Sequence, residues 1–188
     1  ARTPRGFALG LAGVNFGVYL ALLTPVMVSM AFKVQRLDPV NTEASLGLVM
    51  GVGALFALIA NPLAGRLSDR TTSRWGMRRP WILGGSLVGL GGFMLIGVAD
   101  SIWVVMLAWC LVQAAMNAVL AAANATLPDQ VPAESRGRIS GIVGITTPLG
   151  ILAGSFLVNY LPGDFERFVV PGAIAAILAI VFVLLLKD

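Results

Sequence analysis

The sequence lacks histidine altogether, has one cysteine, and carries few charges: only 12% of its 188 residues are charged. Without histidine, the commonest metal ligand and the side chain that titrates near neutral pH are both missing. The single cysteine, Cys110, has no partner for an internal disulfide and lies among apolar residues, as a small buried side chain does. We therefore predict no metal site and no cofactor.

The shortage of charge also excludes an ordinary soluble domain. About 25% of the residues in such a domain are charged, whereas here 57% of residues are hydrophobic and the mean hydropathy is +0.88. The net charge of +4 does not indicate a nucleic-acid partner, because the arginines lie in short connectors and not on one face of a soluble fold. The expected surroundings of this chain are a lipid bilayer.

Long uncharged stretches are what the sequence has in abundance. There are six, each of at least 19 residues, and about 20 helical residues cross a bilayer core of roughly 30 Å. They are continuously apolar, unlike the alternating strands of a membrane barrel. The sequence therefore predicts an all-α integral membrane protein, one domain over residues 1–188. The six transmembrane helices are expected at about 7–32, 44–64, 81–99, 102–126, 139–161 and 168–186.

The basic residues predict how these helices are oriented. Ten Lys and Arg lie on one side of the predicted membrane: Arg2, Arg5, Arg66, Arg70, Arg74, Arg78, Arg79, Arg136, Arg138 and Lys187. Only Lys33, Arg36 and Arg167 lie on the other. Because short cytoplasmic connectors are enriched in Lys and Arg, we expect both termini in the cytoplasm. A plasma membrane is the expected location, most simply that of a bacterial cell.

Polar side chains are few within the predicted helices, and they gather on two of them. Asn15 and Tyr19 lie one turn apart on the first helix, and Gln113, Asn117 and Asn124 share a face of the fourth. Unpaired polar groups are costly in hydrocarbon, so these faces either bond to one another or line a watery cavity. Amides and hydroxyls in a cavity suit a neutral or zwitterionic small-molecule substrate. Both interpretations stay open at this point.

Glycines in the predicted spans indicate where helices pack closely. Glycine pairs four residues apart, such as Gly47 and Gly51 or Gly85 and Gly89, allow helices to approach closely.

No Asp, Glu, Lys or Arg lies within a predicted span, although ion-coupled transporters usually carry one there. Coupling residues are therefore expected outside this chain. Paired carboxylates, histidine ligands and a serine–histidine pair are also missing, so we do not expect an enzyme.

The connector after the second helix reads Gly65-Arg66-Leu67-Ser68-Asp69-Arg70, followed by the pair Arg78-Arg79. This pattern resembles the signature connector between helices two and three of the major facilitator superfamily. The residues from Pro128 to Gly137 resemble that family's connector between helices four and five. The longer form SDRTTSRWGMRRPW resembles the glycoside–pentoside–hexuronide and sucrose–proton symporter-like branches. The resemblance covers the whole chain as the first six of twelve helices.

The resemblance implies a three-plus-three inverted-repeat bundle and a second role for the arginines. In the family, this connector forms a cytoplasmic latch that holds two six-helix halves together. Carried over, Asp69 is the latch carboxylate, Gly65 permits close backbone approach, and Arg136 is a candidate partner within this half. Arg70, Arg78 and Arg79 are expected to bind acids or helix C-termini.

The function expected from these observations is secondary active transport of a small polar solute by alternating access. A sugar is the first substrate expected, with proton coupling through residues that are not in this chain. Two alternatives stay open. One is a drug or lipophile exporter of the same superfamily, and the other is a self-contained six-helix homo-oligomer, either a half-transporter or a channel. The expected partners are therefore the bilayer, the substrate, and a carboxy-terminal six-helix half or a second copy.

Overall fold

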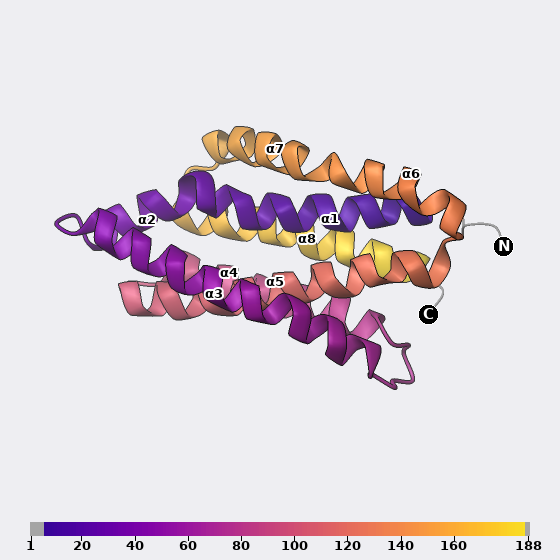
Figure 1. Ribbon diagram of the computed structural model, residues 1–188. Coiled ribbons are helices and arrows are strands. Elements are labelled where there is room, and N and C mark those ends of the chain that lie inside the picture. Colours follow the sequence, from indigo (N-terminus) through magenta and orange to yellow (C-terminus); the bar gives the residue numbers. More distant parts are fainter. Residues whose placement is uncertain (1–5, 187–188) are drawn as a thin grey trace.

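The computed structural model describes residues 6–186, which form one bundle of helices of membrane-spanning length (Figure 1). Six helical spans are long and apolar enough to cross a bilayer, which confirms the predicted fold class. The first span consists of α1 (Phe7–Thr24), a π-helical turn η1 (Pro25–Ser29) and α2 (Met30–Leu37). The remaining elements are α3 (Thr42–Asp69), α4 (Arg79–Val98), α5 (Ile102–Gln130), α6 (Ala133–Gly144), α7 (Thr146–Tyr160) and α8 (Asp164–Leu185).

Two spans are interrupted where proline removes a backbone donor. Pro25 cannot donate to the carbonyl of Ala21, and the π-helical turn begins at this proline. Pro148 cannot donate to the carbonyl of Gly144, and α6 ends at that glycine. α7 then continues the same span.

The helices extend further than the uncharged stretches predicted. The predicted 7–32 becomes Phe7–Leu37, 44–64 becomes Thr42–Asp69, 81–99 becomes Arg79–Val98, 102–126 becomes Ile102–Gln130, 139–161 becomes Ala133–Tyr160, and 168–186 becomes Asp164–Leu185. A charged residue at the end of a span lies outside the hydrocarbon core and is still helical, because the backbone hydrogen bonds of the helix continue into the membrane interface. The first charge was therefore a poor marker of where each helix ends.

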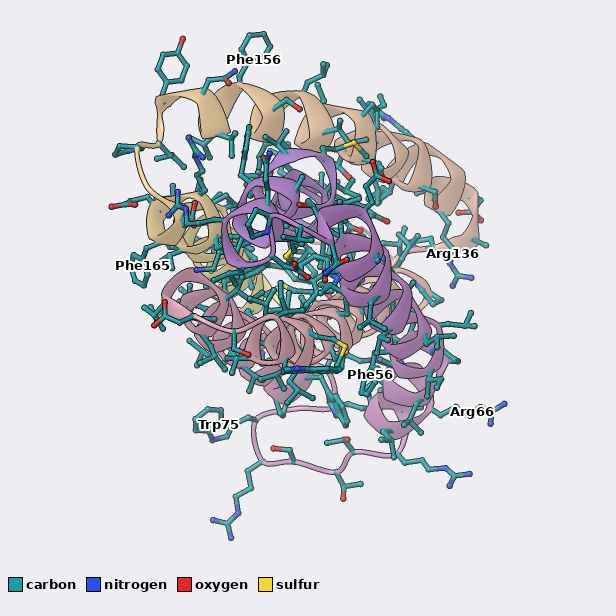
Figure 2. All side chains as sticks on the ribbon, turned by 90° about the vertical axis from the view of Figure 1, so that its left-hand side faces the viewer. Phe56, Arg66, Trp75, Arg136, Phe156 and Phe165 are labelled. Atoms are coloured by element: carbon teal, nitrogen blue, oxygen red, sulfur yellow. The ribbon has the colours of Figure 1, made fainter. Side chains whose placement is uncertain are left out.

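Helix contacts confirm the inverted repeat. α1 packs on α7 and α8, just as α5 packs on α3 and α4. The largest of the other contacts between spans join α4 to α8 and α1 to α5. Exchanging the first three spans with the last three leaves this pattern unchanged, and corresponding spans run in opposite directions. α3 and α7 consequently lie at opposite sides of the bundle (Figures 1 and 2).

Glycines bring some of these helices close together. A Cβ atom on Gly17 would lie 2.9 Å from the Cα of Ala175 in α8, and one on Gly85 would lie 2.9 Å from the carbonyl oxygen of Ala115 in α5. Gly47 and Gly51 of α3 have no such neighbour within 4 Å among the described residues. The predicted seam on the second span is therefore not used within this bundle.

The bundle has two ends. The Arg-rich end, as we call it, contains the α3–α4 connector (residues 70–78), the α5–α6 connector, the start of α1 and the end of α8 (Figure 1). The opposite end contains the α2–α3 connector (residues 38–41) and the start of α8. Arg2, Arg5 and Lys187, which contribute to the predicted orientation, lie outside the described residues.

Candidate functional site

Two of the predicted cavity residues bond to each other across the bundle. Asn15 of α1 and Asn124 of α5 each donate an amide hydrogen bond to the other's side-chain oxygen, at 3.1 and 3.2 Å. The Asn15 amide also donates to the carbonyl of Leu11 at 2.9 Å. Asn15 is fully buried, whereas Asn124 is exposed. The pair satisfies a buried amide and leaves part of Asn124 facing outward.

A second polar group joins α5 to α3. The Asn117 amide donates to the backbone carbonyl of Gln113 at 2.9 Å and to its side-chain oxygen at 3.2 Å. Asn61 of α3 donates to the Asn117 side-chain oxygen at 3.4 Å. Asn61 was not among the predicted site residues. An amide inside an uncharged span is itself a signal, because it needs a partner there.

Two cavities share Tyr19 and Asn124 as walls. The larger, about 340 Å³, opens toward α3, and the smaller, about 290 Å³, opens toward α6 and α7. The larger is lined by Tyr19, Asn61, Pro62, Gly65, Leu120, Ala121 and Asn124. The smaller is lined by Leu11, Asn15, Tyr19, Asn124, Leu127, Ser140, Val143, Gly144 and Thr147.

Both linings combine uncharged polar side chains with apolar ones. Their side chains offer amides and hydroxyls, and no Asp, Glu, Lys or Arg lines either cavity. The larger volume lies within the range of roughly 300–1,000 Å³ that small-molecule sites occupy. Gln113 and Asn117 line neither cavity, so the five predicted residues divide into a cavity group of three and a separate pair.

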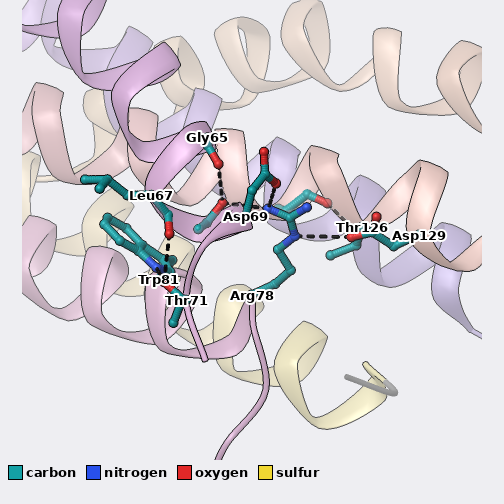
Figure 3. Close-up of polar contacts among 10 residues, drawn as sticks. Gly65, Leu67, Asp69, Thr71, Arg78, Trp81, Thr126 and Asp129 are labelled. Carbon is teal, nitrogen blue, oxygen red and sulfur yellow. Dashed lines mark hydrogen bonds and ion pairs between the residues drawn. The ribbon is translucent and has the colours of Figure 1, made fainter. Parts of the chain in front are cut away.

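At the Arg-rich end, Arg78 joins α3 to α5 (Figure 3). Its side chain is 6% exposed, with Nη1 2.6 Å from an Asp69 oxygen and Nε 3.2 Å from an Asp129 oxygen. Nη1 also donates to the Ser68 hydroxyl at 2.7 Å, and that hydroxyl donates to the Gly65 carbonyl at 2.9 Å. Asp69 and Asp129 stay 59% and 39% exposed. A buried cation thus holds two acids that still face outward.

The other predicted latch residues have different surroundings. Arg79 donates to the carbonyl of Leu186 at the end of α8, where cations are favoured. Arg136 donates to the carbonyls of Val131 and Pro128, each at 2.9 Å, and so closes the end of α5. It does not contact Asp69, which is paired with Arg78 instead. Arg70 is exposed.

Gly65 is not a close-approach position within this chain. A Cβ atom there would have no neighbour within 4 Å among the described residues. Its carbonyl accepts the Ser68 hydroxyl bond, and its backbone lines the larger cavity. Any role that depends on the lack of a side chain at Gly65 therefore involves a surface that faces away from this bundle.

An ion cluster at the opposite end was missed. Asp164, the first residue of α8, lies 3.0 Å from Arg36 and 3.9 Å from Lys33, both on α2. Lys33 also donates to the carbonyl of Gly97 at 3.1 Å. The prediction that no ionisable side chain lies within a span is wrong at the ends of the helices: the first span, for example, continues to Leu37 and includes Lys33 and Arg36. The spacing of Lys33 and Arg36, one helical turn apart, was the available signal.

An inverted repeat of six spans with an uncharged polar face defines half of a membrane transporter fold. The family model described as Major Facilitator Superfamily matches residues 5–188, and the chain belongs to that family. This membership places the chain among membrane transporters and not among enzymes, as the sequence predicted.

Relatives of the chain differ in function. The chain is 31% identical to a general alpha-glucoside permease of Schizosaccharomyces pombe over 82% of its length, and 30% identical to the multidrug resistance protein MdtG of Klebsiella pneumoniae over 85%. It spans 29% and 40% of those two proteins. A solved bacterial homologue of the human lysosomal transporter Spinster, inward-facing and unoccupied, matches 97% of the chain with a TM-score of 0.71. That match covers 43% of the solved chain at 18% identity, and it shows the shared fold.

Proposed function

We propose that this chain forms one half of a secondary active transporter that moves a small polar solute across a membrane by alternating access. The observation that carries the proposal is the pair of cavities around Tyr19 and Asn124, which offer amides and hydroxyls and no charge. Such groups bind the hydroxyls of a sugar without leaving a buried charge unpaired. The similarity to an alpha-glucoside permease supports a sugar as the solute.

Proton coupling, in this proposal, uses residues that are not in this chain. The polar face of α1 and α5 carries no acid or base that could relay a proton. Among the described residues, Lys33 and Asp164 form the pair of opposite charges in which both side chains are buried. This pair lies at the opposite end, and each member already has a partner. The coupling group is therefore expected on the surface that faces this bundle across the cavities.

The second half is either another six-helix bundle of the same protein or a second copy of this chain. α3 is the least buried of the six spans, and Gly47 and Gly51 leave its face open to close approach. Phe156 of α7 points away from the bundle on the other side (Figure 2). The faces of α3 and of α6–α7 that flank the cavities are the surfaces we assign to this partner.

The proposed latch consists of Gly65, Asp69, Arg70, Arg78, Arg79 and Arg136. Its best-supported part is the ion pair of Asp69 with Arg78, because this buried cation holds both Asp69 and a second exposed acid, Asp129, outside the predicted set. On the Lys and Arg counts we assign this end and both termini to the cytoplasm, and we propose a bacterial cell membrane as the location.

A drug or lipophile exporter is the second candidate, and the similarity to MdtG favours it. The two candidates differ in what the cavities must bind. A lipophile gains little from Asn124, whereas a sugar hydroxyl uses its exposed amide directly. A self-contained six-helix channel is the third, and it predicts currents in place of saturable exchange.

The experiment is counterflow in proteoliposomes that contain the protein as its gene encodes it. Labelled disaccharides and a lipophilic dye serve as probes. Asn124→Ala is expected to lower sugar exchange roughly tenfold, because a hydrogen bond of about 1.4 kcal/mol is lost. The matched control is Asn159→Ala, since that asparagine bonds only within α7 and lines neither cavity. Equal exchange in both variants refutes the site, dye transport selects the exporter, and single-channel currents select the channel.

The latch has its own test. Asp69→Asn is expected to slow exchange several-fold while membrane insertion stays intact, because a contact of about 0.3–1 kcal/mol biases a two-state equilibrium by that factor. The control is Glu134→Gln, an exposed acid at the same end. Wild-type exchange by Asp69→Asn would leave the arginines with a purely topological role.

A further inference from the structure

An apolar groove of about 400 Å³ lies between α4 and α5. Pro80, Trp81, Gly84 and Val88 line it from α4, and small residues including Ala114 and Ala118 line it from α5. On α5 these alanines lie roughly 60–100° around the helix axis from Asn117. The groove shares no lining residue with the two polar cavities. It therefore faces a different environment from the candidate transport site.

Two neighbouring glycines explain why the groove is open. A Cβ atom on Gly85 would lie 2.9 Å from the Ala115 carbonyl oxygen, so this glycine is where α4 packs on α5. A Cβ atom on Gly84 would have no neighbour within 4 Å among the described residues. The two helices are thus close at Gly85, while Gly84 leaves the groove open.

The groove begins at the Arg-rich end and extends along one leaflet. From Pro80 to Val88 the helix rises about 12 Å at 1.5 Å per residue, and half of the hydrocarbon core measures roughly 15 Å. Its lining is apolar along that length, and it includes no residue of α3 or of the two polar cavities. Hydrocarbon is the natural occupant of such a surface.

The connector at the mouth of the groove is basic. The Trp81 indole donates to the Thr71 hydroxyl at 2.8 Å (Figure 3), which holds the α3–α4 connector beside the start of α4. Exposed Arg70 and Arg74 flank Thr71 in that connector. Exposed arginines at a bilayer surface attract anionic headgroups by about 1 kcal/mol each, and an indole at the same level is typical of the interface.

We propose that the groove is a binding site for one anionic phospholipid, with an acyl chain along Gly84 and the phosphate beside Arg70 and Arg74. The apolar length, the open glycine and the basic mouth each match one part of such a molecule. The site is independent of the transported solute, so it stands or falls separately from the proposed transport function.

The test uses the protein as its gene encodes it, in nanodiscs with equal amounts of phosphatidylglycerol and phosphatidylcholine of identical chains. Native mass spectrometry then counts the lipids that stay bound after release. The wild type is expected to retain one phosphatidylglycerol that Gly84→Leu loses, because leucine fills the groove. Gly91→Leu is the matched control: the same helix, the same exchange and equally open space, but outside the groove.

Arg74→Gln tests the headgroup separately. The preference for phosphatidylglycerol over phosphatidylcholine is expected to fall about fivefold, the equivalent of roughly 1 kcal/mol. Undiminished lipid retention by Gly84→Leu overturns the groove, as does equal loss in Gly91→Leu. Equal retention of both lipids by the wild type overturns the headgroup site. If Gly84→Leu fails to insert, Ala114→Leu fills the same groove from α5.

Discussion

The two ends of the bundle hold ion clusters at corresponding positions, with the signs of charge exchanged. Arg78 precedes the third span as the N-cap of α4, and Asp164 begins the sixth as the first residue of α8. Arg78 binds an acid near the end of the fourth span, Asp129, and Asp164 binds bases near the end of the first, Lys33 and Arg36. The inverted repeat relates these contacts to each other.

Helix dipoles favour the charge at one of these two positions and disfavour the charge at the other. A helix N-terminus favours an anion and disfavours a cation, so Asp164 is well placed while Arg78 opposes the dipole of α4. Arg78 is accordingly held by two acids, Asp69 and Asp129, which are both partly exposed. Asp164 is buried and binds within one half. The cluster at the opposite end is therefore buried within this bundle, whereas Asp69 and Asp129 at the Arg-rich end are exposed to a further surface.

Asp164→Asn is expected to have the largest effect on stability. It leaves the buried Lys33 ammonium without its counter-ion, and removing one partner of a buried pair costs about 3–5 kcal/mol. Chemical unfolding in mixed micelles measures the loss. Arg36→Gln, which removes the 67% exposed partner, should cost less than about 1 kcal/mol. Equal losses in the two variants would contradict the assignment of Lys33 as the buried partner.

Arg78→Gln is expected to cost less, about 1–3 kcal/mol, because the buried Ser68 hydroxyl loses its donor while both acids can hydrate. Arg78→Lys should recover only part of this, since an ammonium cannot reach three partners as the guanidinium fork does. The same unfolding assay applies, with the exposed Arg74→Gln as control. A loss as large as that of Asp164→Asn would mean that the two ends are closed equally tightly.

Ser45→Ala has the smallest expected effect and concerns another acid at the opposite end. The Ser45 hydroxyl and the backbone N–H of Asn41 both donate hydrogen bonds to the Asp38 carboxylate, and these bonds hold the pKa of Asp38 below its ordinary value. Because folding lowers the pKa of Asp38, its ionised carboxylate stabilises the folded state at pH values above the ordinary pKa. This stabilisation is lost as the pH falls through the lowered pKa of the folded state. The pKa should therefore rise in Ser45→Ala, followed by NMR titration of the carboxylate. Ser101→Ala, at a helix start without a side-chain cap bond, should leave it unchanged.

The sequence predicted the membrane architecture because the signal for it is local. Six continuous apolar stretches and the asymmetry of arginine placement depend on composition along the chain. The ends of the helices were predicted poorly for the same reason. Lys33 looked like the end of a span, although its side chain is buried against α4 and α8 in the folded bundle.

The candidate site was predictable as a set of residues and not as a set of contacts. Asn15, Tyr19 and Asn124 do line cavities, whereas Gln113 and Asn117 bond to each other and Asn117 accepts a bond from Asn61. Arg136 was expected near Asp69 and instead closes the end of α5. Each of these outcomes depends on which helix faces lie together.

Class, number of spans and family motif follow from residue order, because hydrophobicity and charge act on each segment wherever it lies. The pairing of Asn15 with Asn124, the burial of Lys33 beside Asp164 and the groove beside Gly84 required the packed bundle. Those features join residues that are distant along the chain, and only the inverted-repeat packing of the helices brings their atoms within bonding distance.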